Sequence, residues 1–142
     1  MRPSTRSADA VHLRARRRRT SERGAAVVDF VLVLIVLVPL FLGLLQVGLV
    51  LYVRNTLTAA ASEGARYAAT QDRDPVAGAA RTRDQIRGVL VDRFARGVSA
   101  RSTTVDGLPG VEVRVVADVP PLGLWGPAVH LEVTGHGVEE SP

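Results

Sequence analysis

The hydrophobic pattern begins with an unbroken apolar run near the start of the chain. Residues 30–53 comprise twenty-four consecutive positions without a formal charge. As a helix this run would extend about 36 Å, which exceeds the roughly 30 Å hydrocarbon core of a bilayer. A secretory signal has a shorter apolar stretch of about 7–15 residues. The pattern therefore predicts a helix that stays in the membrane.

Small residues follow the apolar run and keep the helical period. Ala60, Gly64 and Ala68 recur every four residues, which places them on one stripe of a helix. An adjacent row has the same spacing: Ala61, Ala65 and Ala69. Small side chains let another helix approach closely. We expect a continuous helix over 25–70 with Ala60, Gly64 and Ala68 as a packing face, and the simpler alternative is an alanine-rich helix without that role.

A second helix is predicted after residue 70. Asp74 is a good N-cap and Pro75 fits the first helical position, so we expect the helix to start there. The pattern continues to Arg96, and Gly97 is the expected stop. The apolar side of this helix comprises Ile86, Val89, Leu90 and Phe94.

Alternation with a period of two replaces the helical period after residue 100. Val111, Val113 and Val115 alternate with Glu112 and Arg114, which is typical of a half-buried strand. Further strands are predicted over 101–105 and 129–134.

These elements indicate the α+β class. The predicted order is a long N-terminal transmembrane helix continuing into an alanine-rich helix, then a head with a small helix and an antiparallel sheet of two or three strands. Trp125, in a loop over 120–127, is expected to fill the edge of the small core, and the alternative is an exposed contact for a partner.

Charge adds an orientation to this picture. Residues 1–24 carry eight arginines against two acids, a net +6, while residues 54–142 are close to neutral. Arginine-rich flanks stay on the cytoplasmic side of a membrane span. We expect a disordered cytoplasmic leader over 1–24, a membrane and juxtamembrane helix over 25–70, and an extracytoplasmic head over 71–142. The predicted location is the cytoplasmic membrane, crossed once.

The arginine run suggests two other uses. One is binding of nucleic acid and the other is a twin-arginine export signal. No nucleic-acid motif accompanies the run, and Thr-Ser-Glu follows it where an apolar residue would favour export. Membrane topology and contact with anionic lipid account for the arginines, so lipid is an expected partner and nucleic acid is not.

An acidic residue stands at the beginning of the apolar run. Asp29 can reach lipid headgroups and the positive end of the helix dipole there, so a plain helix-start role is one interpretation. Gly24 ends the basic leader five residues earlier, and Phe30 follows the acid. This order resembles the processing site of type IV pilin-like proteins, in the variant of the tight-adherence (Flp/Tad) branch. The resemblance implies cleavage between Gly24 and Ala25 by a prepilin peptidase.

The likeness continues through the apolar run, and residues 23–69 resemble the TadE-like family. Matching pieces are Asp29-Phe30, Pro39 within the span, Tyr52-Val53-Arg54-Asn55 at its exit and Glu63-Gly64-Ala65-Arg66 beyond it. The resemblance implies a pilin-like fold and a pseudopilin or minor pilin that takes part in tight-adherence type IV pilus assembly by helix–helix packing. Implied partners are other pilin-like subunits and inner-membrane pilus assembly proteins. The alternative is a signal-anchored cell-surface binding protein without a pilus role.

The sequence contains no motif for catalysis. The chain has no cysteine, which excludes disulfides and thiolate metal sites. His130 and His136 are six residues apart without a third ligand at a suitable spacing. Neither a glycine-rich phosphate loop nor an HExxH motif occurs. We therefore expect no catalytic residues, no metal and no cofactor, and a protein that is not an enzyme.

Overall fold

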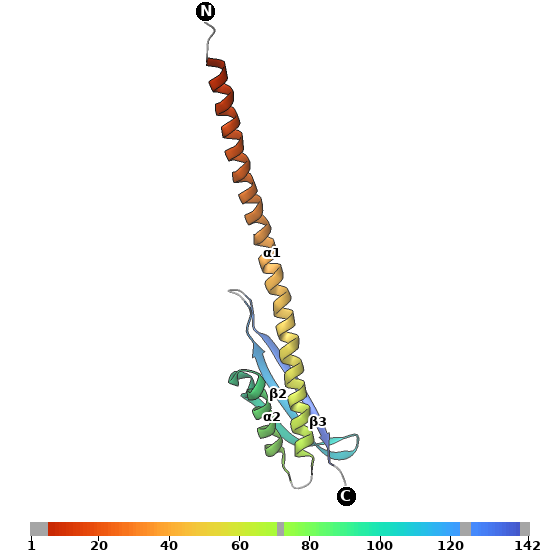
Figure 1. Cartoon of the computed structure of the whole chain (residues 1–142). Helices are drawn as coiled ribbons and strands as arrows, with labels where there is room; N and C mark the ends of the chain where they lie inside the picture. Colours follow the sequence, from red (N-terminus) through yellow and green to blue (C-terminus); the bar gives the residue numbers. More distant parts are fainter. Residues whose placement is uncertain (1–5, 71–72, 123–125, 140–142) are drawn as a thin grey trace, which may run out of the picture. The chain divides into compact units, whose positions relative to one another are not determined.

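The computed structural model of the chain describes residues 6–70, 73–122 and 126–139. The elements follow the order α1 (Arg6–Ala68), α2 (Pro75–Val89), the 3-10 helix η1 (Asp92–Ala95), β1 (Gly97–Val105), β2 (Leu108–Val119) and β3 (Val129–Val138) (Figure 1). The chain forms two compact units, Met1–Leu42 and Gly43–Pro142. The predicted α+β class is confirmed, with a long apolar N-terminal helix, a second helix and an antiparallel sheet.

The first unit is the N-terminal part of α1. This helix begins at Arg6, so the leader that was expected to be disordered is helical from that residue. The physical reason is local, because neither glycine nor proline interrupts residues 6–23 and both alanine and arginine favour helix. A helix already formed over the apolar run can extend backwards at little cost, since only nucleation is unfavourable.

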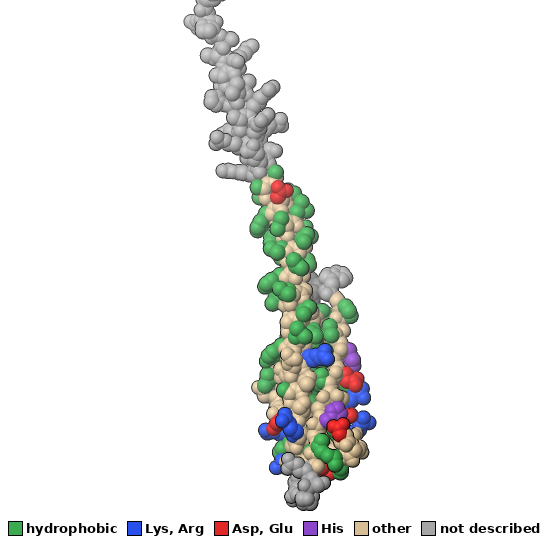
Figure 2. All heavy atoms as spheres, turned by 90° about the vertical axis from the view of Figure 1, so that its right-hand side faces the viewer, with side chains coloured by type: hydrophobic (Ala, Val, Ile, Leu, Met, Phe, Trp, Pro, Cys, Tyr) green, Lys and Arg blue, Asp and Glu red, His purple; other side chains and the backbone are tan. Residues whose placement is uncertain are grey.

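Apolar side chains cover the described part of this unit on every side. Phe30 is 63% exposed and Leu40 is 68% exposed. Figure 2 shows hydrophobic side chains along the coloured part of this helix, with an acidic group near the beginning of that part. A helix that exposes apolar side chains all round needs an apolar surrounding. Within the described residues, one helix is long and apolar enough to cross a membrane, and it fits a single-pass membrane anchor.

The second unit contains the sheet, whose strands lie in the order β1-β2-β3 with antiparallel pairing. Asp106 and Gly107 form the two-residue turn between β1 and β2, and both have positive φ angles, 52° and 84°. Such turns match the right-handed twist of a hairpin. β1 begins at Gly97, four residues before the predicted start of this strand, and β3 also extends beyond its predicted end.

One face of the sheet packs on α1. Val111, Val113 and Val115 are buried there, as their alternation predicts, and they share a core with Val53 and Leu57 of α1. The head therefore includes the second half of α1, beginning at Gly43, and is larger than the predicted 71–142. The apolar face of the three-stranded sheet is covered by α1 together with α2 and η1, which add Ile86 and Phe94 to the same core.

α2 begins as predicted but ends early. The backbone N–H of Ala77 donates a hydrogen bond of 2.8 Å to Oδ1 of Asp74, which is the N-cap. The chain becomes extended at Leu90, and η1 then turns Phe94 into the core. Val89, which was assigned to the apolar side of the helix, is 60% exposed, because the helix ends beside it and α2 no longer faces the core there.

The predicted role of Trp125 concerns a residue that lies outside the described part of the chain.

Candidate functional site

The residues of the predicted processing site lie close together in the first unit. Gly24, Ala25, Asp29 and Phe30 are consecutive positions or near neighbours on α1, and all four are exposed. A Cβ added to Gly24 would meet nothing within 4 Å. The site is thus accessible, and its backbone is helical in the free chain.

The row of small residues on α1 is occupied by α2 of the same chain. Ala60, Gly64 and Ala68 are buried. A Cβ added to Gly64 would collide with Oγ1 of Thr82 and lie 2.7 Å from the carbonyl oxygen of Gly78. The helix that packs on this row is α2.

A buried hydroxyl joins the two helices at this contact. Thr82 is fully buried, and its Oγ1 lies 2.9 Å from the carbonyl oxygen of Gly78 and 3.3 Å from that of Ala60. The pairing satisfies the hydroxyl in a tightly packed place where a larger side chain has no room. Sequence patterns on α1 alone carried no signal for Thr82, because Thr82 lies on α2 and only one of its two partners, Ala60, lies on α1.

The adjacent row of alanines packs on β3. A Cβ added to Gly135 would collide with the backbone of Ala61, and one added to Gly137 would lie 2.6 Å from the carbonyl carbon of Ala65. The strand therefore lies directly on the helix with no side chain between them. Both small-residue rows of α1 build the head, so neither is free for a second protein.

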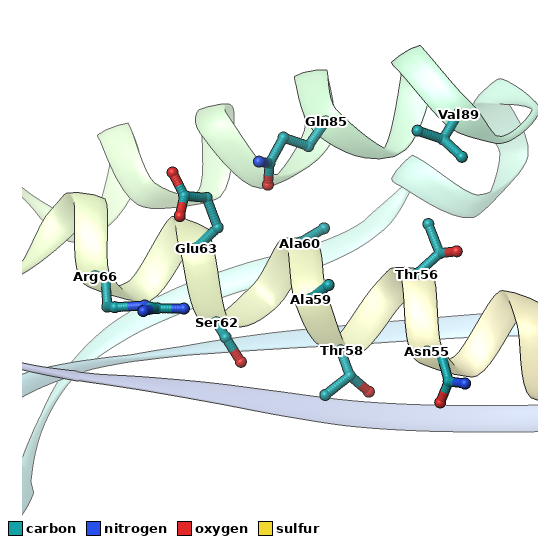
Figure 3. Close-up of a pocket in the computed structure, with 10 residues that line it drawn as sticks. All are labelled: Asn55, Thr56, Thr58, Ala59, Ala60, Ser62, Glu63, Arg66, Gln85 and Val89. Atoms are coloured by element: carbon teal, nitrogen blue, oxygen red, sulfur yellow. The ribbon is translucent and has the colours of Figure 1, made fainter.

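A groove runs along the outer side of α1, next to α2. It has a volume of about 810 Å³. It is lined by Asn55, Thr56, Thr58, Ala59, Ala60, Ser62, Glu63 and Arg66 of α1 and by Gln85 and Val89 of α2 (Figure 3). Gln85 points from α2 toward α1, and its buried Oε1 has no hydrogen-bond partner among the described residues. The lining is mostly small and polar.

The outer face of the sheet is polar and holds the two histidines considered as metal ligands. Nδ1 of His130 lies 2.8 Å from Oδ1 of Asp118, and Nε2 of His136 lies 3.4 Å from Oε2 of Glu112. Each histidine thus faces its own acid on β2. Over the described ranges, no group of three or more histidine, cysteine or acidic residues could hold a metal ion.

The side-chain amide of Gln46 forms hydrogen bonds with a segment that is far away in the sequence. It is the only amide of the apolar run. Its Nε2 donates to the carbonyl oxygen of Pro120 at 3.2 Å, and its Oε1 accepts from the N–H of Leu122 at 2.6 Å. Both partners belong to the loop after β2, which is distant in sequence.

Comparison with known families concerns the last two-thirds of α1, including its alanine-rich end. Residues 24–66 match the family model TadE, described as TadE-like protein. This segment is similar to the TadE-like family. The matched residues begin at the predicted cleavage position and include Asp29 and Gly64, in agreement with the resemblance over 23–69. No curated protein and no solved structure matches the chain.

Proposed function

We propose that this protein is a minor pilin or pseudopilin that takes part in assembly of a tight-adherence type IV pilus. The observation that supports this function is the TadE-like match over 24–66, which coincides with an exposed apolar helix. The proposed partners are other pilin-like subunits and the inner-membrane proteins of pilus assembly. The role is structural, so it needs neither a metal nor a cofactor.

The packing within the head changes where such contacts would form. Because α2 and β3 cover the rows of Ala60 and Ala61, the helix–helix contacts between subunits fall on the exposed apolar part of α1. Gly43 belongs to this part, and a Cβ added there would meet nothing within 4 Å. Small residues and exposed apolar surface favour close approach of helices in a membrane.

The proposed topology has the arginine-rich leader in the cytoplasm and the head outside it. A prepilin peptidase would cleave the peptide bond between Gly24 and Ala25 and leave a new amino group near Asp29. In a bundle of low dielectric constant, that amine pairs with the carboxylate of a neighbouring subunit. Since α1 is helical at Gly24, the peptidase must first open the helix locally, and glycine lowers the cost of opening.

The intact mass of the protein extracted from membranes of its host tests this proposal. We expect a chain that begins at Ala25, and a full-length chain in a strain without its prepilin peptidase. A Gly24→Leu variant should stay uncleaved while it still enters the membrane, and Gly43→Leu is its matched control. A chain that keeps its arginines in every strain would contradict pilin-like processing. It would favour a signal-anchored surface protein.

A further inference from the structure

We propose that the segment 120–122 after β2 is a membrane-contacting element of the head, held at the bilayer surface by Gln46. Its ligand is the interfacial region of the lipid bilayer itself. The inference rests on the single-pass anchor in the proposed function, and adds to it a second point at which the protein contacts lipid.

The first step is the pair of hydrogen bonds at Gln46. One side-chain amide satisfies the carbonyl oxygen of Pro120 and the N–H of Leu122 together. Two successive prolines leave this segment few donors, since proline has no backbone N–H. Backbone groups near lipid must be paired within the protein, because hydrocarbon offers them no partner. The backbone groups that Gln46 pairs therefore need no hydrogen bond from water.

The length of the membrane span places Gln46 at a particular depth in the bilayer. A hydrocarbon core of about 30 Å requires about 20 helical residues. Counted from Ala25, the span ends at Leu44, and counted from Phe30, after the charge of Asp29, it ends at Leu49. Gln46 lies between these limits, so it falls at the outer boundary of the hydrocarbon. Hydrogen bonds then hold the segment 120–122 at the same depth.

Side-chain exposure on α1 and on the segment 120–122 agrees with this depth. Leu44 is 70% exposed and Leu45 is 45% exposed, whereas Leu49 and Val50 already pack on the core of the head. The side of α1 that packs on the head therefore begins just after Gln46, while Val47 and Leu51 continue the exposed apolar side. Leu122 is 40% exposed, and the segment 120–122 has no charged side chain. An exposed leucine on an uncharged loop at this depth meets lipid.

The chain allows a direct measurement of depth, because it contains no cysteine. Single variants Leu122→Cys, Val138→Cys and Leu40→Cys of the full chain are labelled with a nitroxide. They are then reconstituted in vesicles of phosphatidylethanolamine and phosphatidylglycerol. Collision with oxygen reports lipid, and collision with a water-soluble nickel chelate reports water. Val138 is the matched control, since it is 39% exposed and lies at the opposite end of the sheet from Val119.

We expect the label at Leu122 to collide several-fold more with oxygen, relative to nickel, than the label at Val138. The label at Leu40 tests the anchor separately. If Leu40 reports lipid and Leu122 matches Val138, the loop proposal is wrong and the anchor stands. If Leu40 also reports water, the anchor itself fails. If the label at Leu122 collides with neither oxygen nor the nickel chelate, a protein partner covers the loop, and the assignment to lipid is wrong.

Gln46→Leu tests the part that Gln46 plays. This substitution removes both hydrogen bonds and leaves the helix apolar. We expect the label at Leu122 to become more mobile and to lose oxygen contact. The label at Val138 should be unchanged, which shows that the head remains folded. An unchanged depth of Leu122 in this variant would show that Gln46 does not hold the loop.

Discussion

Gly64 on α1 and Gly88 on α2 are both helical glycines, yet their surroundings differ. A Cβ at Gly64 would collide with the hydroxyl of Thr82, whereas a Cβ at Gly88 would meet nothing within 4 Å. Gly64 lies in the interior of α1 and Gly88 in the last turn of α2, and at both positions alanine has the higher helix propensity. Only the contact with a second helix makes one of them necessary.

Gly64→Ala should destabilise the head by about 1–3 kcal/mol, because the added methyl overpacks the contact with α2. Gly88→Ala is the matched control and should raise stability by up to about 1 kcal/mol through helix propensity. Thermal unfolding of the full chain in detergent, followed by circular dichroism, measures both changes. Equal shifts in the two variants would show that α2 does not pack tightly at Gly64.

At the scale of the element, α2 depends on its start and on what it covers. Its N-cap bond between Asp74 and Ala77 could be predicted from the sequence, since the signal is local. The end of α2 could not be predicted in this way. The residues after Val89 keep an apolar pattern, but η1 is needed to bring Phe94 into the core, and only tertiary packing imposes that turn.

Asp74→Ala should lower the free energy of unfolding of the head by about 1 kcal/mol, because the N–H of Ala77 loses its acceptor. Asp84→Ala, on the exposed side of the same helix, should change it by less than about 0.5 kcal/mol. Urea unfolding of the two variants in the same detergent gives the comparison. A loss at Asp84 as large as that at Asp74 would contradict the capping role.

For the whole molecule, the decisive point is where the membrane segment ends and the head begins. The uncharged run over 30–53 is continuous in sequence. The structure divides it, because Val53 is buried in the core of the head while Leu40 is exposed. The same apolar pattern thus serves lipid contact in its first part and protein packing in its last part.

A charge introduced at two exposed positions of the run tests this division. Leu40→Arg should reduce membrane insertion by about 2.5–3.5 kcal/mol, the value for arginine at the centre of a span. Leu51→Arg should have little effect, because Leu51 follows the part of α1 at which packing on the head begins. Extraction of each variant from membranes with alkaline carbonate measures insertion. Equal loss at both positions would extend the span to residue 53.

Features that depend on local pattern could be read from the sequence alone. The apolar run, the alternating valines of β2 and the residues Asp74 and Pro75 each point to one element, and each element is present. The TadE-like resemblance also belongs here, because it rests on the order of residues such as Gly24 and Asp29 along one helix. The physical reason is that helix and strand periods and capping residues act over a few positions.

Tertiary structure alone decided which surfaces remain free. The row of Ala60, Gly64 and Ala68 has the right spacing to receive a helix, but the spacing does not say whose helix it is, and α2 of the same chain occupies it. Gln46 likewise needed a partner more than seventy residues away, Pro120, before its role could be seen. Long-range contacts set these outcomes, because a side chain's partner depends on how distant segments pack and not on its neighbours in sequence.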